Sequence, residues 1–246
     1  MSTPATAGRI IEEEELRAYT KCSQLFHYGG RVDLPLLTKI VKNTVELLIV
    51  EAIRDERILT KDFAGTLRRI FSLLKIKDQM SDGEADKLFR SAVYALDRIL
   101  ESLRNLELVG ISGPFEQRLQ ISKTPINLRF SGLMRKQKTQ ELIIPVFMPS
   151  LGDHAVLNDP ALQLKINQIK RFGKTHNKRP TVSAYVYTIK QDGTVGFYYL
   201  SDKEQDPTRI QMIENQIKAM EIGYHYPIIP CQYSCPFKSK CFPGGK

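Results

Sequence analysis

The 246-residue chain lacks any run of about eighteen or more apolar residues, which is the length that a membrane-spanning helix requires. The longest apolar stretch, from Val45 to Ile53, is interrupted by Glu46 and Glu51. The first residues also lack the basic and then apolar pattern of a signal peptide. We therefore expect a soluble intracellular protein with no membrane partner, in the cytoplasm, or in a host cytoplasm if the chain is viral.

Histidine is scarce, and internal repeats and low-complexity segments are absent. The histidines lie in separate segments, without the spacing of metal ligands, and we interpret each as a surface or capping residue: His27, His154, His176 and His225. With 42% hydrophobic and 26% charged residues, the composition is that of an ordinary globular chain. A chain of this length can bury a core without disulfide bonds.

Acidic residues are outnumbered, which gives a formal net charge of +9. Such a surplus attracts polyanions, and nucleic acid is the commonest of them. The charge is unevenly placed, because Glu12 to Glu15 are acidic whereas basic residues gather after position 164. We predict nucleic-acid contacts at Lys165, Lys170, Arg171, Lys174, Lys178 and Arg179. The alternative is a solvated basic face without a partner.

Cysteine is also rare, but its placement is informative. Cys22 stands alone, whereas Cys231, Cys235 and Cys241 crowd the C-terminal tail. Thiolates select iron–sulfur clusters or zinc, and zinc sites usually come as two close pairs. One distant cysteine and a compact trio suit the separated corners of a cubane cluster better. We predict a [4Fe–4S] cluster on these four residues that joins the two ends of the fold; zinc, or no metal, are the alternatives.

The periodicity of apolar residues divides the chain into a helical part and a mixed part. Helices are expected over 16–26, 34–58, 63–76 and 85–106, the last opened by a Ser81–Glu84 capping box. Strands are then expected over 115–121, 126–135 and 141–148, a helix over 160–172, a hairpin over 181–189 and 194–200, and a helix over 207–222. This order predicts one α/β domain over 1–246, with a helical insertion at 31–110, a core at 113–222 and a cysteine tail at 223–246.

The cysteine layout and the strand block resemble the iron–sulfur members of the PD-(D/E)XK nuclease superfamily, such as AddB and the CRISPR-associated RecB-like nucleases. The segment Leu16 to Tyr28 is similar to the one that carries the family's first cysteine, and Cys235 to Cys241 to its tail. The gap between the first two tail cysteines is three residues here, where the family usually has two. The resemblance implies a nuclease-like central sheet, and Gln163 to Asn167 occupies the place of the Gln-x-x-x-Tyr helix.

The carboxylates that the resemblance calls for are missing. Arg135 falls where the family's metal-binding Asp stands, and the strand from Ile144 to Met148 carries neither an acid nor a lysine. Phosphodiester cleavage with Mg²⁺ needs clustered carboxylates, so we expect a catalytically degenerate member with no catalytic residues. The alternative is an active nuclease whose site is rebuilt from Glu116, Glu141 and Asp153.

These features together predict a non-catalytic nucleic-acid-binding protein, accessory to replication, recombination or transcription. The expected partners are DNA, single-stranded or at an end or junction, and another protein of a nucleic-acid-processing complex. Tyrosines on the expected hairpin, next to Lys and Arg, are candidates for base stacking: Tyr185, Tyr187, Tyr198 and Tyr199. A zinc-stabilised protein-interaction module is a further alternative.

Overall fold

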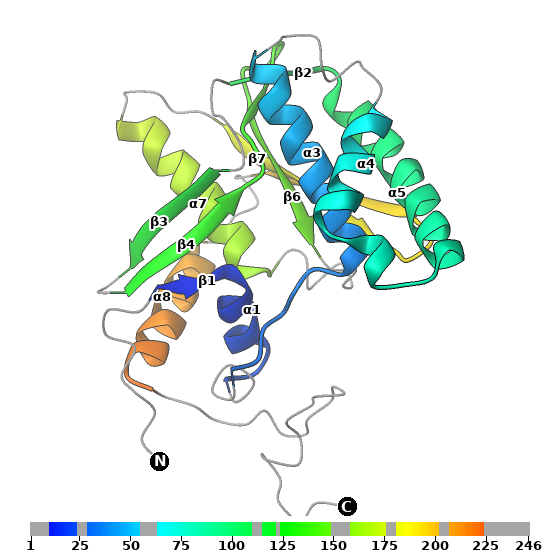
Figure 1. Ribbon diagram of the computed structural model, residues 1–246. Helices are drawn as coiled ribbons and strands as arrows, with labels where there is room; N and C mark the ends of the chain where they lie inside the picture. The colour runs from blue at the N-terminus through cyan, green and yellow to red at the C-terminus, as the bar shows by residue number, and fades with distance from the viewer. Residues whose placement is uncertain are drawn as a thin grey trace, which may run out of the picture.

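A computed structural model describes residues 10–23, 29–54, 63–109, 115–121, 124–148, 158–175, 181–201 and 207–223. Within these residues the chain forms two β-sheets with helices packed against them (Figure 1). The mixed α/β class expected from the order of the elements is confirmed.

The larger sheet has five strands in the order β2-β5-β6-β7-β8. Their bounds are Leu106–Leu108, Met134–Lys136, Leu142–Met148, Val182–Ile189 and Val195–Ser201. Neighbours pair antiparallel except β6 and β7, which are parallel and are joined by the helix α7 (Pro160–Thr175). The hairpin expected around Gln191 to Gly193 is confirmed as β7–β8.

The smaller sheet has three strands in the order β1-β4-β3. β3 (Phe115–Ile121) and β4 (Thr124–Phe130) form an antiparallel hairpin, and β1 (Ile11–Glu12) pairs parallel with β4. β1 leads directly into the helix α1 (Glu13–Lys21), so this pairing fixes where α1 begins. A two-residue strand leaves no alternating pattern, which is why the sequence did not indicate it.

The single strand expected over 126–135 is wrong, because two strands of different sheets share that range. β4 ends at Phe130 and β5 begins at Met134, and the chain crosses between the sheets at Gly132. Gly132 has φ +157, and a Cβ there would lie 3.1 Å from the Cδ1 of Ile49. A side chain would therefore crowd the helix that packs against this crossing.

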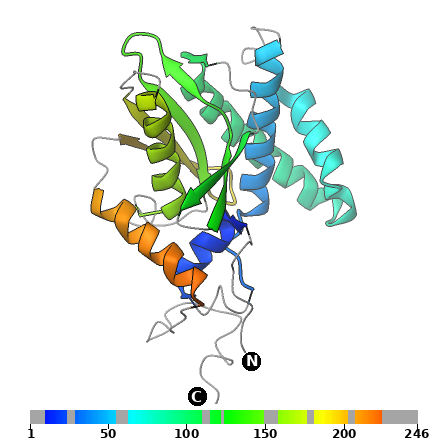
Figure 2. The same ribbon diagram turned by 90° about the vertical axis from the view of Figure 1, so that its left-hand side faces the viewer.

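Helices cover both faces of the five-stranded sheet (Figures 1 and 2). One face packs against α3 (Leu36–Arg54), α4 (Phe63–Leu73), a short 3₁₀ helix (Ile76–Asp78) and α5 (Asp82–Leu103). The other packs against α7, and α1 and α8 (Pro207–Glu221) pack against α7 in the same core. Side chains alternate along β6 between the two cores: Val146 packs in the core that contains α7, α1 and α8, and Phe147 packs in the core that contains α3 and α5.

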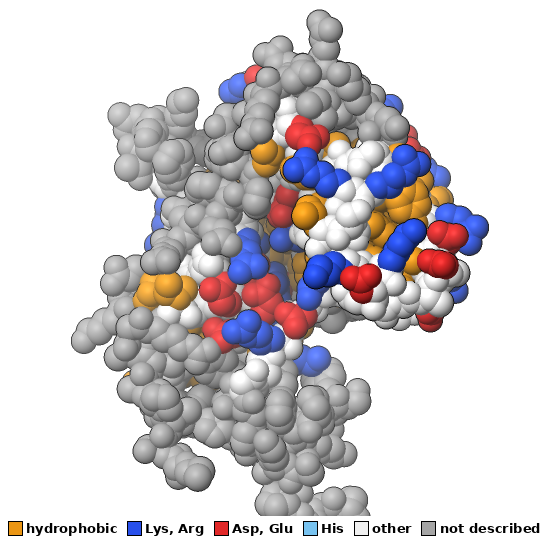
Figure 3. All heavy atoms as spheres, in the orientation of Figure 1, with side chains coloured by type: hydrophobic (Ala, Val, Ile, Leu, Met, Phe, Trp, Pro, Cys, Tyr) orange, Lys and Arg blue, Asp and Glu red, His pale blue; other side chains and the backbone are white. Residues whose placement is uncertain are grey.

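The helical part follows the sequence closely. The expected helices are present within the described residues, but the one expected over 63–76 ends at Leu73 and the one expected over 85–106 ends at Leu103, before β2 begins at Leu106. Ser81 caps α5 by accepting from the Glu84 N–H at 3.4 Å while Glu84 accepts from the Ser81 N–H at 3.0 Å. On the face in Figure 3, the surface over α3 to α5 mixes Lys and Arg with Asp and Glu. None of the described helices combines the length and apolar character needed to cross a bilayer.

Candidate functional site

Cys22 is the one predicted cluster ligand that falls within the described residues, and it forms the C-terminal cap of α1. Its backbone N–H donates to the carbonyl of Ala18 at 2.9 Å, and its free thiol is half-buried. α1 contacts α8, the last described helix, and both helices end on the same side of the molecule (Figures 1 and 2). Cys231, Cys235 and Cys241 lie outside the described residues.

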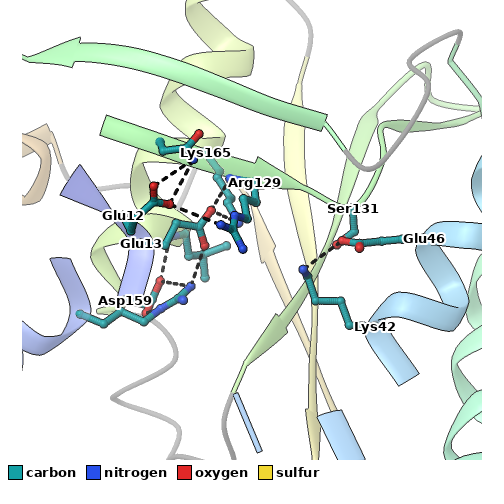
Figure 4. Close-up of polar contacts among 11 residues, drawn as sticks. Glu12, Glu13, Lys42, Glu46, Arg129, Ser131, Asp159 and Lys165 are labelled. Carbon is teal, nitrogen blue, oxygen red and sulfur yellow. Dashed lines mark hydrogen bonds and ion pairs between the residues drawn. The ribbon is translucent and has the colours of Figure 1, made fainter. Parts of the chain in front are cut away.

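α1 is held in place by a network of buried charges (Figure 4). The Arg17 Nε donates to the Asp159 Oδ2 at 2.7 Å, and its Nη2 lies 3.3 Å from the Glu13 Oε2. Glu13 also accepts from the Lys165 Nζ at 2.7 Å and from the backbone N–H of Arg129. The negative charges of the two acids equal the positive charges of Arg17 and Lys165, and each of these four side chains is at most 7% exposed.

Asp159 links this network to the start of α7. Its Oδ1 accepts from the backbone N–H of Leu162 at 2.8 Å, so the carboxylate caps α7 while it binds Arg17 on α1. A buried charge costs several kcal/mol of desolvation unless it is paired. The network therefore fixes α1, and with it Cys22, against α7 and β4.

Burial and pairing oppose each other in setting the pKa values of this network. Burial alone raises the pKa of Glu13, but the charges of Lys165 and Arg17 outweigh it, so the pKa lies below the ordinary 4.5. Burial lowers the pKa of Lys165 more than Glu13 raises it, and Arg17 lowers it further. The pKa of Arg17 is raised, because Asp159 and Glu13 outweigh its burial. At neutral pH, Glu13 is therefore ionised.

The structure places the predicted nucleic-acid contacts in different environments. Lys165 is buried and paired with Glu13, so it does not face solvent as a phosphate contact must, which corrects that expectation. Lys170 is half-buried, and the exposed Arg171 lies 3.8 Å from Glu214. The Lys174 side chain and all of Lys178 and Arg179 lie outside the description. Lys165 turns inward because α7 presents it to α1, where Glu13 offers a charge partner.

Arg135 takes part in a cross-strand ion pair. It lies on β5 opposite Glu107 of β2, and its Nη2 and Nε donate to the two carboxylate oxygens at 2.9 and 3.2 Å. Such a bidentate pair stabilises the pairing of neighbouring strands. The position that the resemblance assigns to a metal-binding Asp thus carries a cation with its own partner.

Of the acids proposed for a rebuilt nuclease site, Glu141 is the one whose side chain the structure describes, and its oxygens are occupied. They accept from the Lys136 Nζ at 2.7 Å and from the hydroxyls of Ser183 and Tyr199. Burial raises its pKa, but these three donors outweigh it and the pKa is lowered. Glu116 lies on β3 of the other sheet, with its side chain outside the description, and Asp153 is not among the described residues.

Glu46, which interrupts the longest apolar stretch, points inward from α3 (Figure 4). It accepts from the Ser131 hydroxyl at 2.8 Å and pairs with Lys42 at 3.1 Å. Ser131 directly precedes the crossing at Gly132, so Glu46 anchors the chain where it passes between the sheets. This role is structural.

An aromatic row lies on one face of the β7–β8 hairpin, and we define it as Tyr185, Phe197 and Tyr199. Tyr185 is 5.0 Å from Phe197 and 6.1 Å from Tyr199 between ring centroids. Phe197 and Tyr199 are 48% and 44% exposed, which is unusual for rings of this size. The Lys136 Nζ lies 4.7 Å from the centroid of the Tyr199 ring.

The row differs from the set of tyrosines that the sequence indicated. Tyr198 points to the opposite face, and Tyr187 is buried with its hydroxyl 2.7 Å from the Ser102 hydroxyl. Sequence reasoning missed Phe197, although strict alternation along β8 puts Phe197 and Tyr199 on one face.

Compared with known proteins, the chain matches no family model and no curated protein.

Proposed function

We propose that this protein binds single-stranded nucleic acid without cutting it and carries a structural [4Fe–4S] cluster. The observation that carries the proposal is the aromatic row beside Lys136, in which Phe197 and Tyr199 are exposed and Tyr185 is half-buried. Bases stack on exposed aromatic rings whatever their sequence, and each stack contributes about 1–3 kcal/mol. The net charge of +9 adds attraction for phosphate.

A hydrogen bond to Glu141 fixes the orientation of the Tyr199 ring in the row. Tyr199 donates its hydroxyl to Glu141, which is itself held by Lys136 and Ser183, so the ring has a fixed position. A platform that is already ordered loses little conformational entropy when a base stacks on it. Because Glu141 neutralises Lys136, the row contributes stacking more than charge.

The test is the affinity of the full-length protein for short single-stranded oligonucleotides, by fluorescence anisotropy. Tyr199→Leu removes the ring and should weaken binding about tenfold, whereas Tyr199→Phe keeps the ring and should retain most of the affinity. Met212→Ala, at a 61% exposed apolar residue on α8, is the control and should bind normally. Wild-type affinity in Tyr199→Leu would overturn the role of the row.

The cluster is proposed on Cys22, Cys231, Cys235 and Cys241. The thiol of Cys22 is free, half-buried and fixed at a helix end, which suits a cluster ligand. Cys231 follows Gly223 by eight residues, and an extended chain of that length spans about 26 Å. Because α1 and α8 contact each other, a tail that leaves α8 begins close to the helix that carries Cys22.

Anaerobic purification with iron, sulfide and zinc counts tests this centre. We expect a brown protein with about four irons and absorbance near 400 nm, as thiolate-bound cubane clusters show. A stoichiometric zinc ion without iron would support the zinc-stabilised alternative instead.

We expect no cleavage of nucleic acid, because the charged residues at the positions of the nuclease site are already paired. Arg135 and Glu107 pair with each other, and Glu141 already accepts from three donors. A divalent ion beside a scissile phosphate needs at least two free hard oxygen ligands. We expect no hydrolysis of DNA or RNA with Mg²⁺ or Mn²⁺, and cleavage that disappears in Glu141→Ala or Glu116→Ala would contradict this.

Membership of the PD-(D/E)XK nuclease superfamily, as a degenerate member with a nuclease-like sheet, is part of the same proposal. The β6–α7–β7 crossover next to the β3–β4 hairpin supports it, since it provides the strands and helix that the resemblance assigns. A role accessory to replication, recombination or transcription, with a protein partner, follows from binding without cutting. Co-purification of the tagged protein with and without nuclease treatment tests for that partner.

A further inference from the structure

A pocket of about 310 Å³ lies between α5 and the β7–β8 hairpin. Its walls include Tyr94 and Arg98 of α5 and Phe197 of β8, with Ser102 and Tyr187 also lining it. The volume is at the lower end of the range of about 300–1,000 Å³ that holds small ligands. The pocket is therefore large enough for one small molecule.

The pocket is preformed, because α5 is fastened to the hairpin on both sides of it. At one end the turn at Gly193, with φ +89, approaches α5 so closely that a Cβ would lie 2.4 Å from the Ser91 carbonyl oxygen. At the other end the hydroxyls of Ser102 and Tyr187 are 2.7 Å apart. Tyr94 and Arg98 lie between these attachments on the same stripe of the helix.

The walls combine aromatic rings with one cation. Tyr94 is 50% exposed and Phe197 48%, and the Arg98 guanidinium lies 5.9 Å from the Tyr94 ring centroid. Arg98 pairs with Glu101 at 3.7 Å, and both side chains are more than half exposed. An ion pair of that kind is weak, so Arg98 can exchange it for a phosphate. None of the described residues that line the pocket is a carboxylate.

We infer that this pocket takes one nucleotide, with the base against Tyr94 and Phe197 and the phosphate at Arg98. Planar rings favour a nucleobase, the guanidinium favours a phosphate, and the size of the pocket limits the ligand to a single unit. Phe197 belongs to both the pocket and the aromatic row, so a strand that stacks on the row leads to the pocket. If the nucleotide in the pocket belongs to a bound strand, the inference rests on the proposed function. If it is a free nucleotide, the inference does not depend on the proposed function.

The experiment compares thymidine monophosphate, thymidine, inorganic phosphate and a short oligothymidylate on the full-length protein. Ligand-observed NMR follows the small molecules, and fluorescence anisotropy follows the oligonucleotide. Arg98→Gln should weaken the binding of thymidine monophosphate about tenfold but leave the binding of thymidine unchanged, whereas Tyr94→Leu should weaken the binding of both. Arg69→Gln is the matched control, since Arg69 is 66% exposed with one weak partner, Glu51 at 3.9 Å, and it should change neither.

The outcomes separate the two proposals. Thymidine monophosphate binding that survives both Arg98→Gln and Tyr94→Leu would overturn the pocket, and so would inorganic phosphate binding as tightly as the nucleotide. Oligothymidylate binding that needs Tyr199 but neither Tyr94 nor Arg98 would also overturn the pocket while leaving the aromatic row intact. Monophosphate binding that needs Arg98, in a protein that binds no oligonucleotide, would support the pocket as a free-nucleotide site and overturn the proposed function.

Discussion

Arg17 and Asp159 are 142 positions apart in the sequence, yet the Nε of the one lies 2.7 Å from the Oδ2 of the other in the interior of the protein. This contact joins the first helix to the N-terminal cap of α7. It explains how the short helix that presents Cys22 acquires a fixed position.

Arg17→Gln should destabilise the protein by about 3 kcal/mol, because it leaves Asp159 and Glu13 with an uncompensated buried charge. The measurement is urea unfolding followed by circular dichroism. Arg69→Gln is the matched control, since Arg69 pairs with Glu51 at 3.9 Å and is 66% exposed, and it should cost less than about 1 kcal/mol. Equal losses in the two variants would contradict the structural role of the network.

Stability should fall on the acid side because of Glu13. Its pKa in the folded protein lies below the ordinary 4.5, so its stabilisation is complete above about pH 4.5 and is lost as the pH falls through the folded-state value. The pKa of Glu141 is lowered as well and adds to the same trend. Unfolding midpoints measured from neutral pH down to about pH 3 test this. Glu13→Gln should flatten the dependence, and an unchanged profile in that variant would exclude Glu13 as its source.

Cys22→Ser should remove the cluster and lower the melting temperature more than the loss of a half-buried thiol accounts for, since metal binding stabilises the folded state. Iron content and thermal unfolding measure the two effects. The control is the same substitution in iron-stripped protein, where it should cost little. If the variant keeps its iron, Cys22 is not a ligand.

Neutralising Lys170, Arg171, Lys178 and Arg179 together should weaken nucleic-acid binding equally for all sequences. Each phosphate contact that is lost should reduce the dependence of log K on log salt by about 0.7 for a single strand. The measurement is a salt titration by anisotropy. Binding with an unchanged slope would show that this basic segment serves another partner. Lys165 is left out because it is buried against Glu13.

Gly193→Ala should destabilise the hairpin by about 2 kcal/mol, because its φ is +89 and the new Cβ would meet the Ser91 carbonyl at 2.4 Å. Gly65→Ala is the control, since Gly65 lies within α4 with nothing within 4 Å of the added atom. That substitution should stabilise the protein by about 0.5–1 kcal/mol. Chemical unfolding of both variants gives the comparison, and equal effects would mean that the approach of the turn to α5 does not matter.

Local patterns in the sequence predicted most of the elements correctly. The helix α5 could be predicted from its capping box and its apolar stripe. The β7–β8 hairpin could be predicted from Asp192-Gly193 between two segments of alternating residues. These signals depend on neighbours within a few positions, which is why they can be read without the fold. The break at Gly132 was missed because the residues on either side continue an alternating pattern.

The sequence by itself determined the class of fold, the basic charge and the one-plus-three spacing of the cysteines. Tertiary structure decided what each charge does: it buries Lys165 against Glu13, gives Arg135 a partner in Glu107 and occupies Glu141 with three donors. It also brought Tyr94 of α5 beside Phe197 of β8 to form a pocket. A side chain's partner depends on which distant segments pack together, and no local pattern in the chain records that choice.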